Sequence, residues 1–190
     1  MPQLRISSGS AKNKRLKAPK ITGFRGVQEI VKSAAFSIIG QDNTDNAVCL
    51  DLYAGSGNMG LEALSRGAAW CDFVDNSALA QQAVEENLRN CGFTEKCSFI
   101  LVDAVKFVAE TPNKYNIIFA DPFYADTTHR FLIKNIAEIL NPKGWVVFTH
   151  GKELSMEAMV KDTNLVIYTQ RRYGGSYLSI LRKTGLSESA

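Results

Sequence analysis

The stretch between Val48 and Gly67 constrains what this chain can fold into more than any other part of its sequence. A short apolar run, Val48 to Leu52, is followed by Ala54-Gly55-Ser56-Gly57, and apolar residues then recur at helical spacing until Gly67. This order predicts a strand, a glycine turn and a helix.

The glycines of this turn fit the pattern G-x-G-x-x-G, with Gly55, Gly57 and Gly60 in its three positions. Such glycines let the backbone approach a ligand closely, while the helix N-terminus presents unpaired N–H groups and a partial positive charge. Asp51 ends the first strand and Asp75 ends the next apolar segment, where a carboxylate can accept hydrogen bonds from both hydroxyls of a ribose. We therefore predict a nucleoside-containing cofactor, with a tight packing turn and solvated acids as the alternative. The predicted contacts are Asp51, Ala54, Gly55, Ser56, Gly57, Asp75 and Asn76.

Strand and helix patterns alternate along most of the chain. We predict strands over residues 48–53, 70–75, 97–102, 115–120 and 145–149, and helices over 58–66, 77–90, 104–110, 127–140 and 152–161. Such alternation predicts a parallel sheet with helices on both faces and ligands at the carboxyl ends of the strands. Two last strands, 164–170 and 177–182, are joined through Gly174-Gly175 and pair antiparallel. The prediction is an α/β domain over residues 41–185 with seven mostly parallel strands and an antiparallel last strand.

The N-terminal segment is strongly basic. Residues 1–26 contain seven lysines and arginines and no acid, whereas the rest of the chain carries a net charge of −4. This asymmetry suggests contact with a polyanion such as nucleic acid; an organelle transit peptide or a disordered tail is the alternative. Alternating Leu4 and Ile6 favour a small hairpin, and an amphipathic helix ending at Gly40, with Lys32 accessible, completes an extension over residues 1–40. The candidate RNA contacts are Arg5, Lys12, Lys14, Arg15 and Arg25.

Other features bear on compartment and metals. The four cysteines form no C-x-x-C pair, which is typical of buried free thiols in a reducing compartment. With only two histidines and no clustered ligands, we expect no metal site, and His150 is interpreted as a structural residue. Apolar runs stay well short of the ~18 residues of a membrane span. We expect a cytoplasmic monomer that does not bind membranes.

The fourth strand ends in an unusual set of residues, Asp121-Pro122-Phe123-Tyr124. Pro122 lacks an N–H and fixes its φ angle, which holds the nearby carbonyls in place. A carboxylate and fixed carbonyls can accept hydrogen bonds from an NH₂ group, and an aromatic ring can stack on the base that carries it. The set predicts a cradle for an exocyclic base amine; otherwise it merely ends a strand and packs on a helix.

Asp103 closes the third strand and precedes a short helix. Its carboxylate and the Ala104 N–H are suited to the edge of an adenine. A helix N-cap is an equally common role for such a residue, and the two roles are compatible.

The order of these features resembles the S-adenosylmethionine-dependent class I methyltransferases that modify amino groups of bases. The run from Asp51 to Ala68, together with Arg5-Ile6-x-x-Gly9, Arg15-Leu16 and Tyr173-Gly174, is similar to the bacterial 16S rRNA guanine-N2 methyltransferase family (RsmD type). The resemblance spans residues 4 to about 182 and implies a Rossmann-like class I methyltransferase fold. It also implies S-adenosyl-L-methionine as cofactor and rRNA or the small ribosomal subunit as partner. By analogy, the methyl group goes to the exocyclic N2 of the guanine at position 966.

The chain departs from the family pattern at three places. Phe123 replaces the second proline of Asp-Pro-Pro-Tyr/Phe, Arg25-Gly26-Val27 replaces Arg-Pro-Thr, and Ser33 replaces a glutamate. Three alternatives therefore stay open: an N6-adenine methyltransferase acting on DNA or RNA, an NAD-dependent oxidoreductase, and an RNA-binding module without activity.

Overall fold

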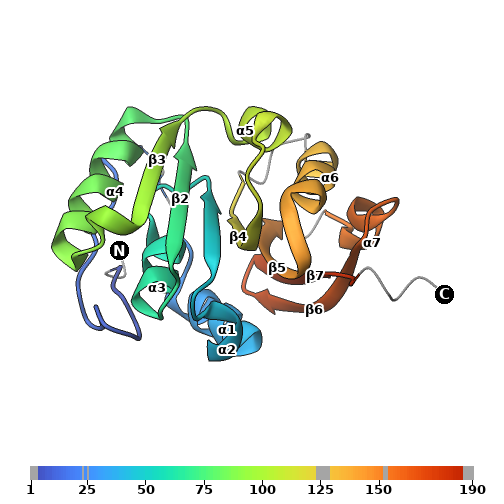
Figure 1. Cartoon of the computed structure of the whole chain (residues 1–190), viewed down its shortest axis with the longest axis horizontal. Helices are drawn as coiled ribbons and strands as arrows, with labels where there is room; N and C mark the ends of the chain where they lie inside the picture. The colour runs from blue at the N-terminus through green and yellow to red at the C-terminus, as the bar shows by residue number, and fades with distance from the viewer. Residues whose placement is uncertain (1–3, 23, 25, 123–128, 152–153, 186–190) are drawn as a thin grey trace.

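One seven-stranded sheet, in the order β3-β2-β1-β4-β5-β7-β6, organises the chain (Figure 1). The computed structural model describes residues 4–22, 24, 26–122, 129–151 and 154–185. In these ranges the strands are β1 (Val48–Leu52), β2 (Trp70–Asp75), β3 (Cys97–Leu101), β4 (Tyr115–Ala120), β5 (Leu140–Gly151), β6 (Leu165–Tyr173) and β7 (Ser176–Lys183). The helices are α1 (Glu29–Ile39), α2 (Gln41–Thr44), α3 (Asn58–Ser65), α4 (Ala78–Cys91), the 3-10 turn η1 (Thr94–Lys96), α5 (Ala104–Glu110), α6 (His129–Ile139) and α7 (Met156–Val160).

The strand directions confirm the predicted fold class. β3, β2, β1, β4 and β5 pair parallel, whereas β7 pairs antiparallel with both β5 and β6. β6 therefore runs in the same direction as β5. The chain leaves β1 toward β2 on one side and returns to β4 on the other, so the carboxyl ends of β1 and β4 flank the topological switch point, where ligands bind in such sheets.

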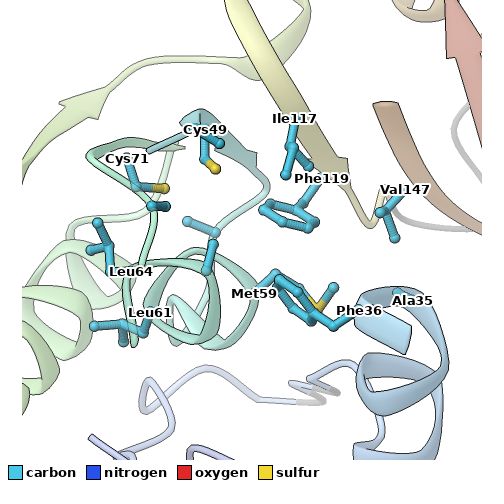
Figure 2. Close-up of a cluster of buried hydrophobic side chains, with 14 of the residues drawn as sticks. Ala35, Phe36, Cys49, Met59, Leu61, Leu64, Cys71, Ile117, Phe119 and Val147 are labelled. Atoms are coloured by element: carbon cyan, nitrogen blue, oxygen red, sulfur yellow. The ribbon is translucent and has the colours of Figure 1, made fainter. Parts of the chain in front are cut away.

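Two buried clusters fill the spaces between the sheet and its helices. On one face, side chains of α1, α3 and α4 pack on β1, β2, β4 and β5; Figure 2 shows Phe36 of α1 and Met59 of α3 beside Phe119 and Val147. On the other face, α5, α6 and α7 cover Leu50, Ile118 and their neighbours. Because both faces are covered, the central strands are continuous apolar runs rather than alternating ones.

The observed boundaries differ from the predicted ones mainly at the later strands. β5 begins at Leu140 instead of 145, because Leu140 already pairs with Tyr115 across a register shift. The β6–β7 turn consists only of Gly174 and Gly175, so residues 171–173 belong to β6 rather than to the loop. Residues 41–46, between the end of the first predicted helix at Gly40 and the first predicted strand, include the short α2. Helix α7 is shorter than predicted because Ser155 caps it, its side chain accepting from Ala158 N–H.

The N-terminal segment forms a minimal hairpin. A single antiparallel bridge joins Arg5 and Arg15, and Ile6 N–H donates to Lys14 C=O at 2.9 Å. Ile6 and Leu16 are buried in the same cluster as β1 and β4. We call residues 4–17 the arm. Among the described residues, no helix has the length and apolar character that a membrane crossing requires.

Candidate active site

Three carboxylates gather at the carboxyl ends of β1, β2 and β4. Asp51 is 4% exposed, and its carboxylate accepts a hydrogen bond from Gly60 N–H at 2.9 Å. Burial raises the pKa of Asp51 to about 8, and the charges of Asp121 and Asp75 add to the shift while the Gly60 N–H opposes it. No ion pair among the described residues includes any of the three. This edge of the sheet therefore gathers acidic groups that have no paired cation among the described residues, and the raised pKa keeps Asp51 largely protonated at neutral pH.

Asp75 is half-buried beside the glycine turn. One of its carboxylate oxygens accepts from Gly55 N–H and the other from Ser77 N–H, both at 2.9 Å. These bonds fix the orientation of the carboxylate, and each oxygen keeps a second lone pair for a ligand. Asn76, its neighbour, is exposed at the same edge.

The glycine turn has the geometry that the motif predicts. Gly55 and Gly57 have φ angles of 54° and 73°, the left-handed region that side-chain-bearing residues avoid. Gly60 serves packing instead, because a Cβ there would lie 2.4 Å from Phe73 Cε1 and 2.6 Å from Cys71 Sγ. α3 thus lies directly against β2. Ala54 and Ser56, the other predicted contacts in this turn, are buried.

Asp103 acts as the N-cap of α5. Its side chain accepts from Lys106 N–H at 3.0 Å, while Ala104 begins the helix and is buried. The capping role that the sequence allowed is confirmed. The exposed Asp103 still has a free carboxylate oxygen for the proposed adenine contact.

Asp121 is held at the end of β4 by a residue from the neighbouring strand. Thr149 of β5 donates its hydroxyl proton to Asp121 Oδ1. Burial raises the pKa of Asp121 to about 6, and the Thr149 hydrogen bond opposes that rise. Pro122 is buried beside it. Phe123 and Tyr124, which complete the predicted cradle, lie outside the described residues.

The tip of the arm, which carries the predicted contacts Lys12 and Lys14, lies away from this site. Arg5, Lys12, Lys14 and Arg15 are all exposed, but the tip of the arm lies at the far end of α3: Ser10 N–H donates to Ser65 C=O, and Ala11 N–H to Ser65 Oγ. The eight residues of α3 span roughly 12 Å. The tip is therefore separated from the glycine turn by the length of this helix. Arg25 lies outside the described residues.

A buried ionic network fastens the arm. Lys32 and Glu62 are both fully buried, with Lys32 Nζ 3.1 Å from Glu62 Oε2. Glu62 also accepts from Ser7 N–H at 2.8 Å, from the Ser7 hydroxyl at 2.7 Å and from Arg66 Nε at 2.8 Å. Burial alone would raise the pKa of Glu62, but Lys32 and the Ser7 hydrogen bonds hold it below its ordinary value. The expectation that Lys32 is accessible was wrong: the side chain is buried, and its ammonium group donates to the Arg5 carbonyl oxygen of the arm.

Two further contacts connect the N-terminal segment to the glycine turn, one from the arm and one from Phe24 beyond it. Asn87 of α4 is fully buried; its amide accepts from Lys17 N–H at 2.8 Å and donates to Lys17 C=O and Ser56 C=O, each at 2.9 Å. Farther along, the ring of Phe24 covers Gly55, where an added Cβ would lie 2.7 Å from Phe24 Cε2. The N-terminal segment is therefore packed against the glycine turn, although the tip of its arm lies at the far end of α3.

His150 has the structural role expected of it. Its Nδ1 is 2.9 Å from Gly151 C=O, which requires that this nitrogen carries the proton, and its Nε2 accepts from Ser179 Oγ at 2.8 Å. The ring stacks on Tyr177 with 5.4 Å between centroids. Burial lowers the pKa of His150, in keeping with a neutral ring.

Sequence reasoning missed Thr149, Glu62 and Asn87. Thr149 continues an apolar strand, and nothing local indicates that it faces Asp121. Glu62 carried a weak signal: a glutamate within an apolar helical pattern, four residues before Arg66, indicates a buried pair. Asn87 offered none, because its partners lie 70 and 31 residues away.

Known proteins are similar to this chain over most of its length. The family model described as "Conserved hypothetical protein 95" matches residues 4–182. The chain is 35% identical over 187 residues to "Putative rRNA methyltransferase YlbH" of Bacillus subtilis, covering 96% of this chain and 100% of the relative. It is 31% identical over 144 residues to "Ribosomal RNA small subunit methyltransferase D" of Escherichia coli, covering 76% and 70%. Among solved structures, "Putative methyltransferase yhhF from Escherichia coli" matches with a TM-score of 0.83 at 23% identity, covering 96% of this chain and 99% of the other, which establishes the shared fold.

Proposed function

Because this chain belongs to the Conserved hypothetical protein 95 family of rRNA methyltransferases, alongside ribosomal RNA small subunit methyltransferase D, we propose its reaction in finer detail. It transfers a methyl group from S-adenosyl-L-methionine to the exocyclic N2 of a guanine in small-subunit rRNA. The observation that carries this proposal is the gathering of Asp51, Asp75 and Asp121 beside the glycine turn.

The donor set fits a cationic cofactor. Bound S-adenosylmethionine supplies a sulfonium-activated methyl group and carries a positive charge on its sulfur. The three acidic groups of this site have no ion-paired cation among the described residues, so a bound cation would favour their ionised forms and be attracted to them. The same carboxylates would repel the negative phosphates of a dinucleotide. The charge of the site therefore favours methyl transfer over the oxidoreductase alternative.

The residues of the turn divide the work of holding the cofactor. The carboxylate of Asp75, oriented by Gly55 and Ser77, accepts from the ribose hydroxyls. Asp103 and the Ala104 N–H bind the adenine edge, and the backbone from Ala54 to Gly57, with Asn76, surrounds the rest. Asp51 keeps the turn in shape through Gly60.

Asp121 positions the amine that receives the methyl group. The lone pair of an exocyclic amine is delocalised into the ring, so the nitrogen reacts only when its hydrogens are held and it points at the methyl carbon. Asp121, held by Thr149, accepts a hydrogen bond from one N–H of the amine, and the backbone carbonyl at Pro122 accepts one from the other N–H. Phe123 and Tyr124 stack on the base. Positioning of this kind can contribute up to about 7 to 11 kcal/mol to the barrier reduction.

The arm supplies phosphate contacts away from the chemistry. The exposed Lys12 and Lys14 lie near the tip of the arm at the far end of α3, and the exposed Arg5 and Arg15 pair at the base of the same hairpin, so together they hold RNA that flanks the target. Arg25 is assigned the same role from the sequence. Contacts of this kind provide affinity without reading bases.

Nucleoside mass spectrometry of small-subunit rRNA, incubated with and without the enzyme, tests the product directly. N2-methylguanosine supports the proposal, whereas N6-methyladenosine would replace it by the adenine alternative. Asp121→Ala then tests the mechanism, with cofactor binding and methyl transfer measured separately. We expect near-normal cofactor affinity and at least a hundredfold loss of transfer, while the exposed Asp42→Ala control keeps both. Normal transfer by Asp121→Ala would remove this residue from the reaction.

The arm is tested by salt dependence. The triple variant Lys12→Ala/Lys14→Ala/Arg15→Ala should bind RNA more weakly and with a flatter dependence on salt. Arg89, Lys96 and Lys143 are also exposed, and changing these three to alanine gives a control of equal charge. Equal salt slopes for the two triple variants would contradict the arm contacts.

A further inference from the structure

The β6–β7 hairpin is a second acid-free basic segment, separate from the arm. Residues 163–187 contain four lysines and arginines and no aspartate or glutamate. The intervening residues 27–162 contain eleven basic and eighteen acidic residues. Residues 27–162 therefore carry a net negative charge, and the net positive charge belongs to two segments that are far apart in sequence.

The four cations of this hairpin have different surroundings. Arg182 lies over the Trp145 ring, 4.9 Å from its centroid, and Lys183 donates to Ala137 C=O and Leu140 C=O at 2.7 Å each. These two serve the fold. Arg171 and Arg172 are instead exposed near the turn, and no ion pair among the described residues includes them.

The two arginines lie at the edge of the sheet that carries the site. β6 runs in the same direction as β4 and β5, so its last residues lie at the same edge as Asp121. Thr149, which binds Asp121, pairs with Leu178 of β7, and Leu178 pairs with Arg171. Residues paired directly across strands share a face of the sheet. Arg171 is thus on the face of Asp121, three strand spacings or roughly 14 Å away.

Several contacts hold the end of the hairpin. Arg172 Nε donates to Gly174 C=O at 2.9 Å across the turn, and Tyr177 of β7 stacks on His150 of β5. Arg172 pairs with Tyr177, which ties it to this stack. An arginine on a fixed strand loses less freedom on binding an anion than one on a mobile tail.

The arm and the hairpin lie at opposite ends of the molecule. The arm binds α3 and α4, beside β1, β2 and β3, whereas β6 is the outermost strand on the other side (Figure 1). Asp121, at the end of the central β4, lies between them. If an RNA strand contacts the arm and continues past Asp121, its negative phosphates are attracted to the exposed arginines of the hairpin.

We propose that Arg171 and Arg172 form a phosphate-binding surface that holds the target RNA on the side of the site opposite the arm. The inference rests on the proposed function, because it takes RNA as the substrate. A separation of roughly 14 Å corresponds to a few nucleotides of RNA, so the bound phosphates would lie close to the target base in sequence. Arg171 is the better residue to change, since Arg172 also supports the turn.

The experiment compares Arg171→Ala, Arg171→Lys and Arg89→Ala with the parent enzyme. Arg89 is exposed near the end of α4 and matches Arg171 in residue type and charge. Binding to transcribed small-subunit rRNA is measured from low to high salt without cofactor, and cofactor affinity is measured without RNA. We expect Arg171→Ala to bind RNA roughly fivefold to tenfold more weakly at low salt, with a salt slope smaller by about 0.7 to 1. Arg171→Lys should recover most of the slope, and cofactor affinity should stay unchanged in every variant.

The outcomes separate the two proposals. If the parent enzyme binds and methylates this RNA and Arg171→Ala matches Arg89→Ala in affinity and slope, the hairpin surface is refuted and the proposed function stands. If the parent enzyme neither binds nor methylates the RNA, the proposed function itself fails. A weaker affinity with an unchanged slope would also refute the hairpin surface, because it excludes lost phosphate contacts.

Discussion

Replacing Thr149 by valine should shift the pH dependence of methyl transfer toward alkaline pH. The Thr149 hydroxyl donates to Asp121, and this bond opposes the rise that burial imposes on the Asp121 pKa. Valine has nearly the shape of threonine but no donor. Removing the bond therefore raises the pKa of Asp121 above its present value of about 6.

The magnitude follows from the strength of hydrogen bonds to charged groups. Such bonds contribute roughly 1.5–3 kcal/mol, equivalent to about one to two pH units. Asp121 is not fully buried, so solvent reduces the effect and we expect about one unit. At pH 7 the ionised fraction of Asp121 then falls from about nine-tenths to about one-half. Because the ionised carboxylate is the better acceptor for the amine, the rate falls about twofold from ionisation alone.

The assay is single-turnover methyl transfer to small-subunit rRNA between pH 5 and 9, with Thr149→Ser as the matched control that keeps the hydroxyl. We expect the acidic limb of Thr149→Val to move up by about one unit and the loss to shrink above pH 8. Thr149→Ser should follow the parent profile. A uniform loss at every pH, with the limb unmoved, would refute the argument, since it indicates a packing effect instead of a change in Asp121.

Three other substitutions test the scaffold. Lys32→Met leaves the buried Glu62 without its main counter-charge and should lower the free energy of unfolding at pH 7 by about 3–5 kcal/mol in urea titrations, whereas Lys96→Met on the surface should not. Folding lowers the pKa of Glu62, so the ionised Glu62 stabilises the parent above its unfolded pKa, and this stabilisation is lost as the pH falls. The difference in free energy of unfolding between the parent and Lys32→Met should therefore narrow below pH 4. Gly60→Ala forces a Cβ against Phe73 and Cys71 and should cost about 1–3 kcal/mol of stability, measured by thermal unfolding. Folding raises the pKa of Asp51, so the free energy of unfolding falls as the pH rises toward 8. Asp51→Asn still accepts a hydrogen bond from Gly60 N–H and should stabilise the cofactor-free protein at pH 8 by on the order of a few kcal/mol. Equal stability of this variant and the parent at pH 8 would contradict the raised pKa.

The sheet could be predicted from the sequence because its information is local. Strands buried on both faces are runs of apolar residues, so β1, β2 and β4 were found within a residue of their true ends. The glycine turn was equally local, since positive φ angles favour glycine and the close packing of α3 on β2 leaves no space for a Cβ at Gly60. The start of β5 was missed because residues 141–144 contain a proline, a glycine and Lys143 with a φ of 61°, all of which are typical of a loop.

The contacts of the arm could not be predicted in this way. A lysine in an amphipathic helix is expected on its exposed face, and only the tertiary structure places Lys32 between Glu62 and the arm. Ser7 and Glu62 are 55 residues apart, and neither carries a mark that identifies the other. The basic composition of the arm was visible, but composition does not locate it. Only the hydrogen bonds to Ser65 show that its tip lies at the far end of α3 from the chemistry.

The placement of charge gives these separate features a common physical reason. A parallel sheet delivers Asp51, Asp75 and Asp121 to one edge, where burial and, to a smaller extent, the neighbouring carboxylates disfavour the ionised form of Asp51, which a bound cation would favour. The same negative charge would repel an RNA backbone, so cations that hold RNA are most useful outside the cluster, where they attract phosphate without neutralising the carboxylates that the cofactor needs. The arm beyond α3 and the hairpin on β6 both satisfy this condition. If the arm and the hairpin bind RNA as proposed, the separation between basic surfaces and acidic site follows from binding a cation and a polyanion in one small domain.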